Sequence, residues 1–421
     1  MSREFNFIEK FYHARYQQDL FDTFVTYSHF VNPLDRNTIE NVMGSIVRSH
    51  AFFRQACHES TFNTLSPDQI DIAAQIEIVS PEKIPEFCVD LCCATSSFPY
   101  EGEVGWRLYY AENSQILILH CNHVLFDGQS AANFHKLFAE HVGDGKGITI
   151  DGQVDVPFVD STRLVNYSPS KLEIVKKVAG ILLKSWWYHR NTFRMPAAIS
   201  APGRRAPHIK VLTLSKDQTD RLIAVCRSRK VALSSLLLSL THLATLYLTA
   251  NTDVVCDVPV SLRRWLDKEQ ASTVYPGFDP DFGFFVTAAS LLIHSQKKFS
   301  WDIVSKLHAN LHALATPQAI TDVGLLESVD ANKYLKEATT KSKASTFELS
   351  NLGSIKLDTS VVDSVVFVQA PGHVSGYFCT NAVGYGTGLS ISLTCVQEVN
   401  QSAFFAEFER LLMGIIETGE A

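Results

Sequence analysis

A histidine and an aspartate four residues apart, His123 and Asp127, are the residues of this chain best placed to do chemistry. A neutral imidazole has a pKa suited to taking a proton from a group that it activates. Asp127, four residues further on, lies too far along the chain to share the direction of the imidazole. We therefore expect Asp127 to brace the loop by pairing with a distant cation.

The elements on either side must hold this loop in place. The apolar run at 115–119 predicts a buried strand, and apolar residues at helical spacing over 131–142 predict an amphipathic helix. His123 would then lie just beyond a strand end, where a rigid scaffold can hold a base against an approaching substrate. Gly128 would allow the chain to turn sharply into the helix.

Three stretches of the sequence resemble one acyltransferase superfamily, which includes chloramphenicol acetyltransferase, the plant BAHD enzymes and peptide-synthetase condensation domains. His-Val-Leu-Phe-Asp-Gly at 123–128 resembles its His-x-x-x-Asp-Gly signature. Val-Pro-Val-Ser-Leu-Arg-Arg at 258–264 resembles the stretch in which these enzymes keep an arginine that pairs with the motif aspartate. Ser-Asn-Leu-Gly at 350–353 resembles a turn of the alcohol acetyltransferases. The order and spacing are most similar to the fungal alcohol O-acetyltransferases, over nearly the whole chain.

The sequence also departs from these patterns. Asn122 stands where condensation domains carry a second histidine. Asp281-Phe-Gly283 is similar to the Asp-Phe-Gly-Trp-Gly of BAHD enzymes, but it lies too early and lacks the tryptophan. We expect no catalytic role for it.

The resemblance implies transfer of an acetyl or other acyl group from coenzyme A to the hydroxyl group of a small or apolar alcohol. His123 would be the general base, and Asp127 would form an ion pair with Arg263, with Arg264 as the alternative partner. No metal and no permanently bound cofactor are implied, because acetyl-CoA or another acyl-CoA arrives as a co-substrate. The candidate contacts to the developing oxyanion or to coenzyme A are Ser350, Asn351 and Gly353.

Other functions are compatible with the same residues. The chain could be a catalytically silent binding module similar to a condensation domain, or an N-acyltransferase acting on an amine. The retained base and ion pair favour the enzyme, because a module freed from catalysis need not keep them. His120, His123 and Asp127 could also ligate a metal, but their mixed spacing disfavours this. We expect His120 to be structural or to support His123.

The expected fold class is α+β, a two-layer arrangement of two lobes similar to chloramphenicol acetyltransferase. The lobes would form a pseudo-dimer with the active-site tunnel between them. We place the first lobe at 1–150, a crossover with an amphipathic helix at 151–207 and the second lobe at 208–421. Gln-Ser-Ala at 129–131 recurs 272 positions later, at 401–403, and this indicates a weak internal repeat.

The hydrophobic pattern predicts further elements. It indicates a helix at 37–50 with Asn37 as a candidate cap, and an almost fully buried helix at 232–249. It also indicates one strand that begins at Asp281 and another that ends in the small-residue turn at 350–353.

Composition and charge limit the partners. The apolar content of 46% supports a large core, and the net charge of −7 gives no sign of nucleic-acid binding. The N-terminus lacks the regions of a signal peptide, and no apolar run is long enough to span a bilayer. The nine cysteines sit mostly within apolar strings, which predicts buried free thiols. We expect a cytoplasmic monomer.

The segment 169–190 combines basic residues with two tryptophans and apolar residues at helical spacing. Such a helix can lie on a membrane or a lipid droplet. Composition alone favours a linker helix whose apolar side packs on a lobe, with peripheral lipid association as the alternative.

Overall fold

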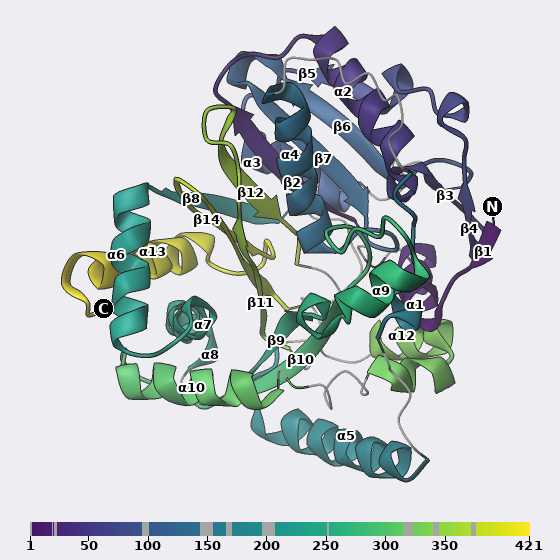
Figure 1. Ribbon diagram of the computed structural model, residues 1–421. Helices are drawn as coiled ribbons and strands as arrows, with labels where there is room; N and C mark the ends of the chain where they lie inside the picture. The colour runs from purple at the N-terminus through teal and green to yellow at the C-terminus, as the bar shows by residue number, and fades with distance from the viewer. Residues whose placement is uncertain are drawn as a thin grey trace.

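The computed structural model describes residues 2–18, 20, 23–94, 101–143, 155–165, 171–195, 207–250, 252–314, 316, 323–339, 345–371 and 376–421. These residues form two large β-sheets flanked by helices, together with a small three-stranded sheet (Figure 1). The expected α+β fold class is confirmed. Part of the expected crossover at 151–207 lies outside the described residues. Within the described ranges, no helix has both the length and the apolar content needed to cross a bilayer.

The first large sheet carries the histidine loop, and we call the part of the molecule built on it the first lobe. Its strands, in spatial order, are β12 (Val362–Val368), β2 (Thr23–Phe30), β7 (Ile116–Asn122), β6 (Trp106–Ala111) and β5 (Ile76–Val79). Neighbours are antiparallel except β5 and β6, which are parallel. Its main helices are α1 (Phe7–Gln17), α2 (Arg36–Ser49), α3 (Ile84–Cys93) and α4 (Gly128–Gly143).

The continuous apolar run of β7 reflects burial on both faces of this sheet. Leu117 and Leu119 pack in the core that includes α2 and α4, whereas Ile118 packs with residues of α3. Because successive side chains of a strand point to opposite faces, a strand covered on both sides needs apolar residues at every position. The strand continues past the predicted end at Leu119, so His120 is a buried strand residue.

Helix α2 begins one residue before the predicted start. Asp35, and not Asn37, is its cap, because the Asp35 side chain accepts a hydrogen bond of 2.6 Å from the backbone N–H of Thr38. A carboxylate at this position satisfies a backbone donor that the helix itself leaves open.

Helix α4, which opens at the histidine loop, is held on β2 by a buried polar network. The ring nitrogens of His135 lie 2.8 Å from the Ser28 hydroxyl oxygen and 2.9 Å from that of Thr26. Burial lowers the pKa of His135 to about 3, so the ring is neutral and makes both bonds without a buried charge. The network fixes the rotation of α4 on the sheet, and with it the position of the loop at its N-terminus.

The second large sheet defines the second lobe. Its strands, in spatial order, are β10 (Val286–Ile293), β9 (Val254–Ser261), β11 (Phe347–Ile355), β13 (Phe378–Tyr385), β14 (Gly388–Cys395) and β8 (His208–Leu214). Four helices contribute apolar residues to its core: α6 (Lys216–Ser228), α7 (Leu233–Ala244), α10 (Trp301–Leu314) and α13 (Gln401–Thr418). The predicted helix at 232–249 is buried, but it is divided into α7 and the short α8 (Leu246–Thr249).

The remaining elements lie around the two lobes. The small sheet pairs β1 (Ser2–Glu4), β4 (Thr61–Thr64) and β3 (Gln55–His58). Further helices are α5 (Lys171–Asn191), α9 (Lys268–Val274) and α12 (Ala331–Thr339). Helix α5 lies at the edge of the molecule, and α12 lies beside α1 (Figure 1).

The two sheets do not divide the chain at a single point. Strand β12 lies within the expected second lobe at 208–421, yet it pairs with β2 of the first sheet. Sequence periodicity identified this strand but could not show its partner, because pairing depends on register between distant segments.

The internal repeat is supported by the positions of whole elements. Strands β6 and β7 and helix α4 recur 272 positions later as β13, β14 and α13. At the same offset, Cys395 and Val399 replace His123 and Asp127. Of the two copies, the first alone therefore carries the histidine and the aspartate of the motif.

Candidate active site

His123 lies one residue beyond β7 and lines a cavity of about 350 Å³. The wall of the cavity comes from both lobes: β2, the loop after β12 and the start of α4 from the first, and β9, β10 and β11 from the second. Helix α1 adds further side chains. The base predicted from the sequence is thus placed where the two lobes meet.

The backbone of the loop selects the tautomer of His123. Its Nδ1 atom lies 2.9 Å from the carbonyl oxygen of Phe126, which can only accept a hydrogen bond. Nδ1 therefore carries the proton, and Nε2 keeps the lone pair that a base needs. Asn122 closes the same loop, since its side-chain oxygen accepts the N–H of Val124 at 2.7 Å and its carbonyl accepts that of Phe126 at 3.0 Å.

Aromatic rings surround the imidazole and keep it neutral. The ring centroid of His123 lies 4.6 Å from that of Tyr12, 4.9 Å from Phe24 and 5.6 Å from Phe284. Burial, and to a smaller extent the charge of Arg15, lower the pKa of His123 to about 4. At neutral pH the ring is therefore uncharged and able to accept a proton.

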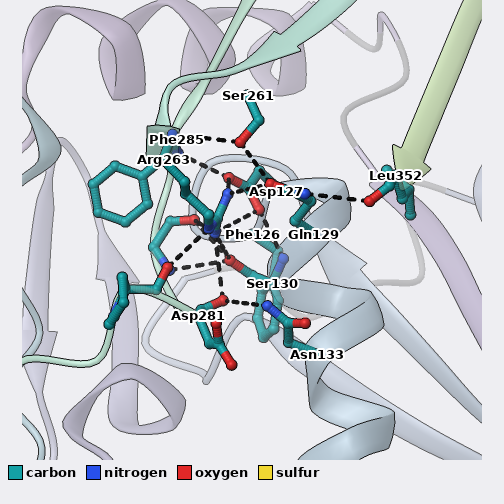
Figure 2. Close-up of polar contacts among 12 residues, drawn as sticks. Phe126, Asp127, Gln129, Ser130, Asn133, Ser261, Arg263, Asp281, Phe285 and Leu352 are labelled. Atoms are coloured by element: carbon teal, nitrogen blue, oxygen red, sulfur yellow. Dashed lines mark hydrogen bonds and ion pairs between the residues drawn. The ribbon is translucent and has the colours of Figure 1, made fainter. Parts of the chain in front are cut away.

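Asp127 and Arg263 form the expected ion pair, which joins the two lobes (Figure 2). The Arg263 guanidinium donates to both carboxylate oxygens, at 2.6 and 3.1 Å. The backbone N–H groups of Ser130 and Phe285 add bonds of 2.8 Å each. The side chains of Asp127 and Arg263 are 2% and 14% exposed. Arg264 instead lies over the ring of Trp265, 4.0 Å from its centroid.

Residues 281–285 wrap around this ion pair, which is why the strand expected to begin at Asp281 starts only at Val286. The Ser130 hydroxyl donates to the Gly283 carbonyl at 2.7 Å and accepts from the Gly283 N–H at 3.0 Å and from Arg263 at 2.9 Å. The one hydrogen and both lone pairs of the hydroxyl are thereby used. The segment at 281–283 braces the pair (Figure 2).

Gly128 lies in a close contact with the second lobe, and its backbone is outside the left-handed region. A Cβ atom at this position would lie 2.7 Å from Cδ2 of Leu352 in the second lobe. Next to it, the Gln129 side chain donates to the Leu352 carbonyl at 3.2 Å and accepts from the Ser261 hydroxyl at 2.5 Å. The first turn of α4 is therefore clamped by the second lobe.

The Ser-Asn-Leu-Gly stretch lies inside β11 and not in a turn after it. A bulge interrupts the pairing with β13 between Asn351 and Ser354, and Gly353 has a left-handed backbone with φ of +78°. The Asn351 side chain accepts the N–H of Gly353 at 3.0 Å and donates to the Ser234 hydroxyl at 3.0 Å. Ser350 and Asn351 line the cavity, and Gly353 shapes the bulge that presents them.

Sequence reasoning missed several residues of the cavity. Tyr12 and Arg15 come from α1, a stretch of the sequence in which we recognise no motif. Asp257 and Glu348 come from β9 and β11 of the second lobe. For Asp257 the available signal was a charged residue within the largely apolar β9, because burying a charge requires a partner or a function.

The family is shown by a comparison of the whole sequence. The model of the family described as alcohol acetyltransferase matches residues 82–416, a range that holds the histidine loop, Arg263 and the bulge of β11. The chain belongs to the alcohol acetyltransferase family. Membership of this family supports acyltransferase activity.

Relatives of this alcohol acetyltransferase family member are distant. An uncharacterized protein of Schizosaccharomyces pombe is 24% identical over 381 residues, 82% of this chain and 80% of the relative. A probable alcohol acetyltransferase of Fusarium pseudograminearum is 24% identical over 304 residues, 66% of this chain and 62% of the relative. The structure is similar to that of a trichothecene 15-O-acetyltransferase from Fusarium sporotrichioides, with a TM-score of 0.68, 12% identity and coverage of 100% and 96%. This likeness shows the two-lobed fold of the chloramphenicol acetyltransferase type.

Asp127→Asn should lower the free energy of unfolding by about 3–5 kcal/mol, because the buried Arg263 guanidinium would lose its opposing charge. Urea denaturation measures this change. Asp281→Asn is the matched control, because it breaks a partly exposed pair with Lys136 close by and should cost about 0–1 kcal/mol. Equal losses in the two variants would show that the Asp127 pair carries no special stability.

His123 should titrate near pH 4 and not near the ordinary value of 6.5. Arg15→Gln should move its pKa upward, because the positive charge that disfavours the imidazolium is removed. NMR of histidine-labelled protein follows the titration, with the His123 signal assigned by its loss in His123→Ala. A midpoint near 6.5 in the wild type would contradict the buried environment of the ring.

Proposed function

We propose that this chain is an acyl-CoA-dependent O-acyltransferase, which moves an acetyl or other acyl group to the hydroxyl group of an alcohol. The observation that supports the proposal best is the state of His123, a neutral imidazole with its Nδ1 proton bonded to the loop and its Nε2 lone pair available in a cavity between the lobes. No covalent nucleophile is needed, because a thioester is already activated.

The reaction follows from this arrangement. The acceptor hydroxyl donates its proton to Nε2 of His123 while its oxygen attacks the thioester carbonyl. The tetrahedral intermediate then collapses, the carbon–sulfur bond breaks, and the imidazolium returns the proton to the leaving thiolate. An ester and free coenzyme A result. The proposed donor to the developing oxyanion is the second amide hydrogen of Asn351, because the Ser350 hydroxyl gives its one hydrogen to Glu348.

One chain supplies every residue of the proposed site, which supports function as a monomer. The base, the ion pair and both walls of the cavity come from a single pair of lobes. The nine buried free cysteines support a reducing, cytoplasmic location. The walls next to His123 are aromatic, and they suit an acceptor with an apolar portion beside its reacting hydroxyl.

We also propose that α5 rests on an anionic lipid surface. The linker interpretation expected its apolar side to pack on a lobe, yet seven large apolar side chains are 38–68% exposed: Leu172, Val175, Val178, Ile181, Leu183, Trp186 and Trp187. Tyr188 is buried and attaches the helix to the protein. Lys176 and Arg190 are exposed beside these apolar residues, and they supply the attraction to anionic headgroups.

His123→Ala should lower kcat about 10²–10⁴-fold while the fold stays intact, because the general base is lost and the ion pair is not. The assay is thiol release from acetyl-CoA with a panel of alcohols, and thermal unfolding reports the fold. His58→Ala, at an exposed histidine, is the matched control and should not change turnover. Wild-type turnover in His123→Ala would exclude the histidine as the base. A wild type that releases no thiol with any acceptor would point to the silent binding module.

The wild type should pellet with phosphatidylserine vesicles at low salt and less at high salt, because basic residues near an anionic surface contribute about 1 kcal/mol each. Reversing two charges with Lys176→Glu/Lys177→Glu should weaken binding by at least about tenfold. Lys216→Glu, at an exposed lysine of α6, is the control and should bind as the wild type does. Co-sedimentation that is absent, or that is unchanged by the double reversal, would rule out electrostatic docking through α5.

A further inference from the structure

The part of the cavity wall contributed by the second lobe carries two carboxyl groups in register. Glu348 of β11 is the backbone partner of Asp257 of β9, and both residues line the cavity. Residues at matched positions of neighbouring strands project to the same face, with their backbones about 4.8 Å apart. Like charges in such a pair repel each other, so the pair favours a cation beside it.

One oxygen of Glu348 is held by the protein. Its Oε1 atom accepts from the Gln369 amide at 2.9 Å and from the Ser350 hydroxyl at 3.3 Å. Among the described residues, none donates a hydrogen bond to Oε2. Burial raises the pKa of Glu348, and the nearby Asp257 adds to this effect. A positively charged ligand would donate a hydrogen bond to Oε2, and its charge would lower the raised pKa of Glu348.

Among the described residues, the lining of the cavity includes the carboxyl groups of Asp127, Asp257 and Glu348 and the guanidinium groups of Arg15 and Arg263. Asp127 and Arg263 neutralise each other, and Asp257 accepts the Ser290 hydroxyl at 2.6 Å. The charge of Arg15 acts on Glu348 from nearby, and a cationic group on a substrate would add to it.

The sheet register sets the distance between this wall and the base. Gln369, which binds Glu348, follows the last residue of β12, and β12 pairs with β2. On the other side of β2, Thr23 pairs with Asn122, the residue before His123. Gln369 and His123 thus leave the same end of the sheet two strands apart, on the order of 10 Å.

The surface between these two points is apolar. The Phe24 ring of β2 lies 4.9 Å from the His123 ring and 5.6 Å from that of Phe367, measured between centroids. Both phenylalanines line the cavity. A hydrocarbon chain fits along this surface with a hydroxyl group at one end and a polar group at the other.

We propose that Glu348 binds an ammonium group at the far end of the acceptor, so that the acceptor is an amino alcohol with an apolar chain between its two functional groups. This inference rests on the proposed function, because it assumes that the hydroxyl group meets His123. Glu348 acts in specificity: it binds the end of the substrate that does not react.

A series of acceptors with one chain length tests this specificity. The wild type should use 6-amino-1-hexanol with a kcat/KM about 10- to 100-fold above that of 1-hexanol, with 1,6-hexanediol between them, which is the range that a charged hydrogen bond supplies. Glu348→Gln should bring the ratio of amino alcohol to alkanol close to one. Glutamine can still accept from Gln369, so the wall is preserved.

Glu417→Gln, at an exposed carboxyl group of α13, is the matched control and should leave the ratio unchanged. A ratio that is the same in the wild type and in Glu348→Gln would overturn the role of Glu348. Equal use of the diol and the amino alcohol would overturn the preference for a cation. Acylation at nitrogen, identified by mass spectrometry, would overturn the orientation of the acceptor.

Calorimetry of 6-amino-1-hexanol binding separates this inference from the proposed reaction. His123→Ala should bind the amino alcohol, and His123→Ala/Glu348→Gln should bind it at least about tenfold more weakly. If the wild type acylates no alcohol but these binding results hold, the proposed reaction fails and recognition by Glu348 stands. If alcohols are acylated but the two variants bind alike, the reaction stands and recognition by Glu348 fails.

Discussion

The ion pair between Asp127 and Arg263 is the contact on which the site depends. It lies where the first turn of α4 meets the second lobe, and each partner comes from a different lobe. Four donors converge on the Asp127 carboxylate, and removing any one would leave polar atoms buried without full compensation. Because His123 belongs to the same loop, the pair also sets where the imidazole lies relative to the opposite wall of the cavity.

The aspartate and the histidine of the motif therefore have separate tasks. The Phe126 carbonyl, and not the Asp127 carboxylate, accepts the Nδ1 proton of His123. A carboxylate bonded to the ring would raise the pKa of His123 further, whereas the neutral carbonyl orients the ring and leaves Asp127 to raise its pKa only through space. The result is an imidazole that is neutral over the physiological range and that owes its tautomer to the shape of a short loop.

The two copies of the strand–strand–helix repeat share their elements but differ at the positions of His123 and Asp127. The first copy keeps His123 and the carboxylate of the ion pair, and at the matching positions the second has Cys395 and Val399, which are both buried. In place of a second histidine loop, the second lobe supplies Arg263 and a cavity wall with Glu348 and Asp257. A single cavity thus receives its histidine from one lobe and much of its polar lining from the other.

The sequence by itself determined the elements whose burial pattern is local. The apolar run before His123, the helix after Gly128 and the buried helix near 232–249 follow from periodicity, because each residue there reports whether its own face is covered. The resemblance of its motifs also predicted the pairing of Asp127 with an arginine, and it singled out His123 as the candidate base. Tertiary structure alone decided which of the two adjacent arginines pairs with Asp127. Arg263 and Arg264 are adjacent on a 3-10 turn, so their side chains leave in different directions, and only one meets α4. Packing between the lobes likewise decided that Gly128 lies against Leu352, that β12 joins the first sheet and that Glu348 faces the cavity of His123. Each of these depends on which distant segments lie side by side, and local sequence patterns carry no information about that.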